Sequence, residues 1–206
     1  IAFHQSNEIL GRLAKKAALT AELEAEMRHG YYANISYLDA QLGKVLDALD
    51  QHPDAANTII SFVGDHGYHI GEHGLWGKTS NFEYDAQVPM FLSTPGMKTA
   101  GQQTLALAEL VDLFPTLVSL CKLPAAPGLD GSDLSAVLTD PTLKVDGAAF
   151  TQHPRPAYFD REPSKRPTHM GYSVRTSRVR YTEWRDWDTG EVKARELYDH
   201  DGGDAA

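Results

Sequence analysis

A long helical pattern that leads into a short, β-branched apolar run restricts this chain to an α/β fold. The pattern extends from Thr20 to Asp50, with apolar residues at three- and four-residue spacing and acidic residues in the first turns. Thr20 is a suitable N-cap, and Pro53 ends the helix. The run 57–64 is almost continuously apolar, which predicts a strand buried on both faces of a parallel sheet.

The chain divides at a Pro- and Gly-rich stretch, residues 124–131, which predicts two parts, 1–123 and 124–206. In the first part we expect a second core strand over 88–93 and a buried helix over 110–120. Smaller expected features are a short helix over 10–19, an N-cap at Asp112 and a frayed tail over 201–206.

The second part has the pattern of a small antiparallel sheet. Its expected strands cover 148–152, 171–175, 180–187 and the residues around 196–198. A turn signal, Asp188-Thr189-Gly190, separates the last two of them. Residues 153–169 are rich in Pro, Arg and Lys, and we expect them to form a surface loop.

The composition excludes several classes of protein. The 206 residues carry a formal net charge of −9, which argues against nucleic-acid or anionic-membrane partners, because both require a basic face. No apolar run reaches the about 18 residues of a membrane span. The single cysteine, Cys121, provides no internal disulfide framework. An anionic substrate would therefore need a local cluster of cations or a metal.

Residues 64–78 are the main candidate site. They combine five glycines with one Asp, one Glu, three His and one Lys. Asp65 and His66 leave the predicted strand as adjacent groups that can bind a metal, at the strand end where α/β folds place their ligands. Lys78 is a compact positive charge suited to an anionic oxygen. Together these groups suit a tetrahedral oxyanion whose ester is hydrolysed.

For other residues, a structural role must be weighed against a functional one. Bracing of the loop explains His69 and Glu72 better than ligand binding. Arg155, Arg175 and Tyr68 are candidate substrate-binding residues, since arginine can hold a carboxylate or sulfate with two hydrogen bonds. Solvated or surface ion-paired arginines are the alternative. Packing is the expected role of the large aromatic residues Trp76, Trp184, Trp187, Tyr31 and Tyr37.

Several motifs, in order along residues 20–200, give the chain a specific resemblance. They include Phe62-Val63-Gly64-Asp65-His66-Gly67, Gly71-Glu72-His73-Gly74, Lys78-Thr79-Ser80-Asn81-Phe82-Glu83, Val88-Pro89-Met90 and Glu196-Leu197-Tyr198-Asp199. The chain resembles the carboxyl-terminal part of a type I sulfatase, and within that family it is most similar to the iduronate-2-sulfatase group.

The resemblance implies an alkaline-phosphatase-like α/β sheet flanked by helices, followed by a small antiparallel-sheet subdomain. It also implies hydrolysis of sulfate esters on sugars or similar compounds, with a bound Ca²⁺ and a formylglycine nucleophile. Asp65 and His66 take the positions of metal ligands, Lys78 that of a sulfate contact, and His73 lines the pocket, where it could protonate the leaving oxygen. Imidazole favours zinc or manganese over calcium, so another divalent metal is an alternative. An exported location follows by analogy only.

The nucleophile motif of that family, Cys/Ser-x-Pro-x-Arg, does not occur in these 206 residues. Cys121 has its proline at the wrong spacing, and the segment starting at Ser93 has Met97 where arginine is needed. We therefore expect an amino-terminal part to supply the formylglycine, and we expect the isolated chain to be inactive. Two alternatives remain: a metal-dependent phosphomonoester or phosphodiester hydrolase, and a non-catalytic fragment.

Overall fold

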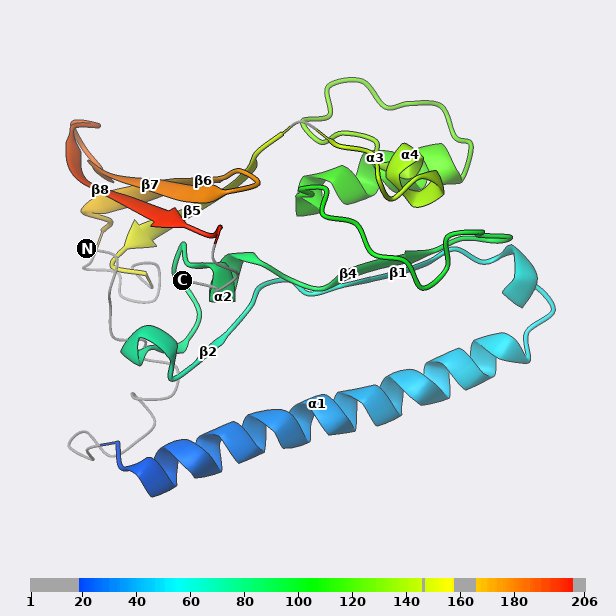
Figure 1. Ribbon diagram of the computed structural model, residues 1–206, viewed down its shortest axis with the longest axis horizontal. Helices are drawn as coiled ribbons and strands as arrows, with labels where there is room; N and C mark the ends of the chain where they lie inside the picture. The colour runs from blue at the N-terminus through cyan, green and yellow to red at the C-terminus, as the bar shows by residue number, and fades with distance from the viewer. Residues whose placement is uncertain (1–18, 146, 158–165, 202–206) are drawn as a thin grey trace.

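The computed structural model describes residues 19–145, 147–157 and 166–201 (Figure 1). The expected helix over 10–19 and the expected frayed tail over 201–206 therefore lie almost entirely outside the described residues. The helical elements are α1 (Ala21–Asp50), η1 (Ala55–Asn57), η2 (Glu72–Gly74), α2 (Glu83–Ala86), η3 (Leu110–Asp112), α3 (Leu113–Leu120) and α4 (Ser135–Thr139). The strands are β1 (Ile60–Val63), β2 (His69–Ile70), β3 (Trp76–Gly77), β4 (Met90–Ser93), β5 (Ala149–Arg155), β6 (His169–Arg175), β7 (Val179–Asp186) and β8 (Val192–Asp199).

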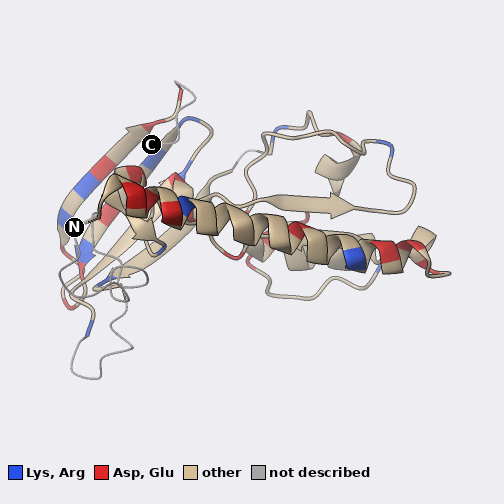
Figure 2. Cartoon of the chain, turned by 90° about the horizontal axis from the view of Figure 1, so that it is seen from below, with Lys and Arg blue, Asp and Glu red and all other residues tan. Residues whose placement is uncertain are grey.

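Helix α1 confirms the sequence prediction in its bounds. The Thr20 hydroxyl accepts a hydrogen bond from the Leu23 N–H at 3.3 Å, which caps the first turn. The expected packing role of Tyr37 is wrong within the described residues, because no residue of α1 is buried and Tyr37 is 67% exposed. The middle of the helix carries few charges (Figure 2). Helix α1 therefore presents apolar side chains that nothing in the described part of the chain covers.

Strands β1 and β4 pair antiparallel, with Ile60 opposite Ser93 and Val63 opposite Met90. This corrects the prediction of a parallel sheet with β1 buried on both faces, since none of its residues is buried. The physical reason is the route of the chain, which leaves β1, runs through residues 64–89, here called the site loop, and returns beside the same strand (Figure 1). Each strand has one neighbour within the described residues, so both keep a free edge.

The carboxyl-terminal sheet confirms the predicted antiparallel arrangement, with order β5-β6-β7-β8. The expected surface loop over 153–169 is wrong at both ends, because Arg155 belongs to β5 and pairs with His169 of β6. Pro154 is tolerated there because β5 is an edge strand, where a missing N–H costs no ladder hydrogen bond. Residues 158–165 lie outside the described part.

The small core lies between the site loop and this sheet. Leu75 and Phe82 from the loop pack with Trp184 from β7, and each of the three is at most 6% exposed. The predicted helix over 110–120 is a 3₁₀ turn, η3, continued by α3. Asp112 caps η3 rather than α3, because its carboxylate accepts from the Glu109 N–H. None of the helices in the described part combines the length and apolar character that a bilayer crossing requires.

Candidate functional site

Asp65 and His66 follow β1 directly and lie close together. The His66 N–H donates to Asp65 Oδ1 at 3.0 Å, and Asp65 Oδ2 lies 3.4 Å from His66 Nε2. His66 Nδ1 lies 2.9 Å from the Gly67 carbonyl, which can only accept, so Nδ1 carries the proton and Nε2 keeps its lone pair. Both side chains are accessible, Asp65 at 89% and His66 at 36%. The carboxylate and the imidazole lone pair therefore form one exposed pair of potential metal donors.

Lys78 joins this pair from a different part of the loop. Its ammonium lies 2.6 Å from His66 Nε2, across a sequence separation of twelve residues. The short strands β2 and β3, which pair His69 with Gly77, return the chain to this point. The structure thus brings together three residues that the sequence proposed: Asp65, His66 and Lys78.

These residues fit a divalent cation in part. Among the described residues, no three or more His, Cys, Asp or Glu side chains form a group that could hold a metal ion. Calcium requires six to eight oxygen ligands, and Asp65 and His66 offer one carboxylate and one nitrogen. The pair can contribute two ligands to a larger coordination shell.

His73 and Tyr68 belong to the 64–78 segment, and each makes an aromatic contact with a residue outside it. His73 has a left-handed backbone (φ 54°) and stacks on Phe82 with ring centroids 4.5 Å apart. Burial, and then the charge of His69, lower the pKa of His73 below its ordinary value, so it carries less positive charge near neutral pH. Tyr68 stacks on Tyr31 of α1 at 5.4 Å.

The two candidate arginines make contacts inside the protein. Arg155 is 7% exposed, lies over the Trp184 ring at 4.6 Å and donates to the Thr79 carbonyl at 3.0 Å; burial lowers its pKa to about 10. Arg175 donates from Nε to Glu83 Oε1 at 2.6 Å. Arg175 thus forms a partly buried ion pair rather than the surface pair considered from the sequence.

Sequence reasoning missed the groups that hold the loop in place. Glu83 accepts from both Arg175 and Arg180, and Asp85 accepts from His69, and all of these contacts are largely buried. The sequence held one sign that Arg180 is buried, because strand alternation places it on the same face as Trp184. No local pattern predicts that Glu83 lies opposite β6 and β7, since the separation exceeds ninety residues.

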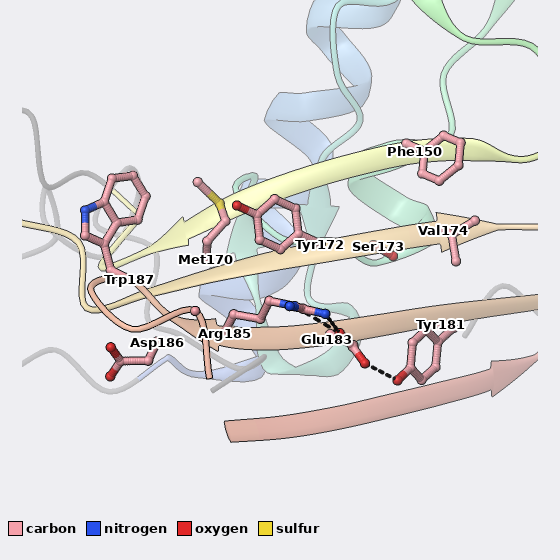
Figure 3. A pocket seen from close by; sticks show the side chains of 11 residues that line it. Phe150, Met170, Tyr172, Ser173, Val174, Tyr181, Glu183, Arg185, Asp186 and Trp187 are labelled. Carbon is pink, nitrogen blue, oxygen red and sulfur yellow. Dashed lines mark hydrogen bonds and ion pairs between the residues drawn. The ribbon is translucent and has the colours of Figure 1, made fainter. Parts of the chain in front are cut away.

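A separate hollow of about 670 Å³ lies on the outer face of the carboxyl-terminal sheet (Figure 3). Tyr172 and Trp187 lie along one side of it, and Glu183 of β7 is held by Arg185 and Tyr181. These hydrogen bonds lower the pKa of Glu183 to about 2. No residue of the 64–78 loop lines this hollow.

Comparison with known families identifies the first part of the chain. A family model described as "Sulfatase" matches residues 2–123. Iduronate 2-sulfatase from Mus musculus is 35% identical over 233 aligned residues, which cover 86% of this chain and 42% of the mouse protein. The aligned region therefore spans less than half the length of this relative.

Two solved structures share the fold. BT4656, solved with its substrate D-glucosamine-2-N,6-O-disulfate, has a TM-score of 0.70 at 24% identity and covers 84% of this chain and 33% of its own. The phosphonate monoester hydrolase SpPMH from Silicibacter pomeroyi has a TM-score of 0.77 at 22% identity, covering 91% and 37%. The fold is accordingly an α/β sheet with flanking helices, of the alkaline-phosphatase-like kind, joined to a small antiparallel sheet.

Proposed function

This chain belongs to the sulfatase family, and from that premise we propose that it supplies the sulfate-binding and metal-binding part of a sulfuric ester hydrolase. The substrate class is a sulfated sugar, as the name of the iduronate 2-sulfatase relative suggests. The observation that carries the proposal is the contact between Lys78 and His66 at 2.6 Å beside Asp65. The positive charge of Lys78 beside two potential metal donors, Asp65 and His66, suits an anionic tetrahedral group.

The residues divide the chemistry among them. Asp65 and His66 would hold the cation, which we propose to be Ca²⁺; it would take the place of the Lys78 ammonium at His66 Nε2 and supply positive charge that stabilises the developing anion. The Lys78 ammonium neutralises sulfate oxygens and orients the ester. His73 donates a proton to the leaving oxygen. Because the pKa of His73 is lowered, its protonated form becomes abundant only at a pH more acidic than an ordinary histidine requires.

We propose that the nucleophile, a formylglycine, comes from residues outside these 206, in an amino-terminal part of the same protein. The absence of the Cys/Ser-x-Pro-x-Arg motif supports this, as do the apolar residues that α1 and β4 expose, such as Val45 at 64% and Phe91 at 64%. The free edge of β1 offers hydrogen bonds to a further strand. We also propose an exported location, by analogy with the family.

The test is a kinetic comparison in a polypeptide that contains these residues and the nucleophile segment. Lys78→Ala is expected to lower kcat/KM on p-nitrophenyl sulfate at least tenfold, which corresponds to about 1.4 kcal/mol. Lys44→Ala, which removes an exposed lysine on α1 bonded to Gln41, is the control and should leave kcat/KM unchanged. Equal kinetics for both variants would remove Lys78 from the site. Sulfate release by the isolated 206-residue chain would contradict the missing nucleophile.

A phosphoester hydrolase is the second candidate. Two observations favour it: His66 offers imidazole, which suits zinc or manganese, and the fold also occurs in a phosphonate monoester hydrolase. A phosphoester hydrolase would hydrolyse aryl phosphate faster than aryl sulfate, whereas a sulfatase would show the opposite preference.

A further inference from the structure

A buried His–Asp pair joins β2 to α2 within the site loop. His69 is fully buried, and its Nδ1 lies 2.9 Å from Asp85 Oδ1. The other carboxylate oxygen, Oδ2, accepts from the Ser80 N–H at 2.7 Å and from the Ser80 hydroxyl at 2.6 Å. The carboxylate therefore acts as an acceptor throughout, and His69 Nδ1 donates.

Asp85 connects the two segments that carry the site. Its backbone carbonyl accepts from the Gly67 N–H at 2.8 Å, one residue after His66. Its side chain holds Ser80, two residues after Lys78. Through His69, which is paired with Gly77 in the β2–β3 ladder, it also holds the residue before Lys78.

We propose that Asp85 and His69 are positioning residues that set the contact between Lys78 and His66. Lys78 lies between two fixed points, Gly77 paired with His69 and Ser80 bonded to Asp85. Thr79, the residue between Lys78 and Ser80, has a left-handed backbone (φ 83°), which is unfavourable for a β-branched residue unless its neighbours are held. The positioning role can be tested without the proposed function. Only its expected effect on catalysis rests on the proposed function.

The identity of residue 69 supports this role. His69 Nε2 is buried and has no hydrogen-bond partner among the described residues, which makes a histidine more costly there than an apolar ring of similar size. Phe82 and Tyr84 surround it with aromatic contacts that a phenylalanine would also make. The Nδ1 bond to Asp85 is the interaction that an apolar ring cannot replace.

The test uses the 206-residue chain labelled with ¹⁵N-histidine and long-range ¹H–¹⁵N spectra. A Lys78→Ala variant defines the Nε2 shift of His66 without its donor. His69→Phe is expected to move the His66 signal to that reference position. His69→Asn, whose amide can donate in place of Nδ1, is expected to keep the wild-type position. The indole N–H of Trp184, bonded to Glu196 at 2.8 Å, reports on the fold in the same sample.

Asp85 variants give a second route, which stays informative if one variant fails to fold. Asp85→Ala is expected to shift the His66 signal fully, and Asp85→Asn, with one acceptor oxygen, part of the way. Asp112→Asn is the matched control, because Asp112 is equally buried and accepts two backbone N–H groups far from the site. It should leave His66 unchanged.

The proposal is overturned if His69→Phe and Asp85→Asn both keep the wild-type His66 signal while the Trp184 indole signal shows a folded sheet. In a polypeptide with the nucleophile segment, Asp85→Asn should also lower kcat/KM on p-nitrophenyl sulfate at least tenfold. If the wild-type polypeptide does not hydrolyse this ester, the proposed function fails, and the His66 spectra still decide the positioning role.

Discussion

Glu83 holds the site loop to the carboxyl-terminal sheet, and its removal should cost the chain much of its stability. Oε1 accepts from Arg175 Nε at 2.6 Å and from Arg180 Nε at 3.0 Å. The side chains of Glu83 and Arg180 are 7% and 3% exposed. Burial lowers the pKa of Arg180, and the charge of Glu83 opposes that shift. The Glu83→Gln variant leaves the buried guanidinium without a counter-charge.

The size of the loss follows from this burial. Breaking a buried ion pair by removing one partner costs about 3–5 kcal/mol. Arg180 keeps hydrogen bonds to the hydroxyls of Thr151 and Ser173, so we expect a loss near the lower limit, about 3 kcal/mol. An exposed pair is the control: Asp199→Asn breaks the contact to Arg178, with both side chains more than half exposed, and should cost far less stability than Glu83→Gln.

Urea unfolding followed by tryptophan fluorescence measures both free energies. The double variant Glu83→Gln/Arg180→Met should recover part of the loss, because it removes the uncompensated charge as well. A Glu83→Gln variant that loses no more stability than Asp199→Asn, or a double variant that is no more stable than Glu83→Gln, would show that the uncompensated charge of Arg180 does not cause the loss.

Three further predictions concern the site loop. Gly67→Ala places a Cβ 1.9 Å from the Tyr84 carbonyl oxygen and should cost about 1–3 kcal/mol in urea unfolding; an unchanged midpoint would contradict the close approach. Arg28→Ala removes the 2.9 Å hydrogen bond from Arg28 to the Ile70 carbonyl. It should speed amide hydrogen exchange in residues 69–77 but not in β7. The same increase in β7 would contradict a local effect of this hydrogen bond. His73 has a folded-state pKa below its unfolded value of about 6.5, so its contribution to stability is complete above that pH and is lost as pH falls through the lowered value. His73→Gln should therefore reduce the drop in unfolding free energy between pH 7.5 and 5.5, and an identical drop would contradict the lowered pKa.

Local patterns predicted the elements well where the chain's own neighbours decide the structure. The capped helix α1 and the four strands of the carboxyl-terminal sheet follow from periodicity and turn residues over short distances. Pairing direction does not follow from such patterns. An apolar run such as 57–64 fits either a parallel or an antiparallel partner, and β1 pairs antiparallel with β4.

Some site residues could be predicted from the sequence and others could not. Asp65, His66 and Lys78 could be proposed because their residue types stand out within fifteen residues of sequence. Arg175 could not be placed, because its contact with Glu83 joins positions more than ninety residues apart. The His69–Asp85 pair has a signal too weak for sequence reasoning, since a lone histidine in a loop has many structural explanations.

In the proposed function, Asp65, His66 and Lys78 belong to a sulfate-ester active site. The most direct measurement is the ratio of kcat/KM on p-nitrophenyl sulfate to that on p-nitrophenyl phosphate, for a polypeptide that contains these residues and the nucleophile segment. We expect a preference for the sulfate of at least tenfold, and we expect Lys78→Ala to lower kcat/KM on the sulfate at least tenfold. A preference for the phosphate of the same size would contradict it and assign the site to a phosphoester hydrolase.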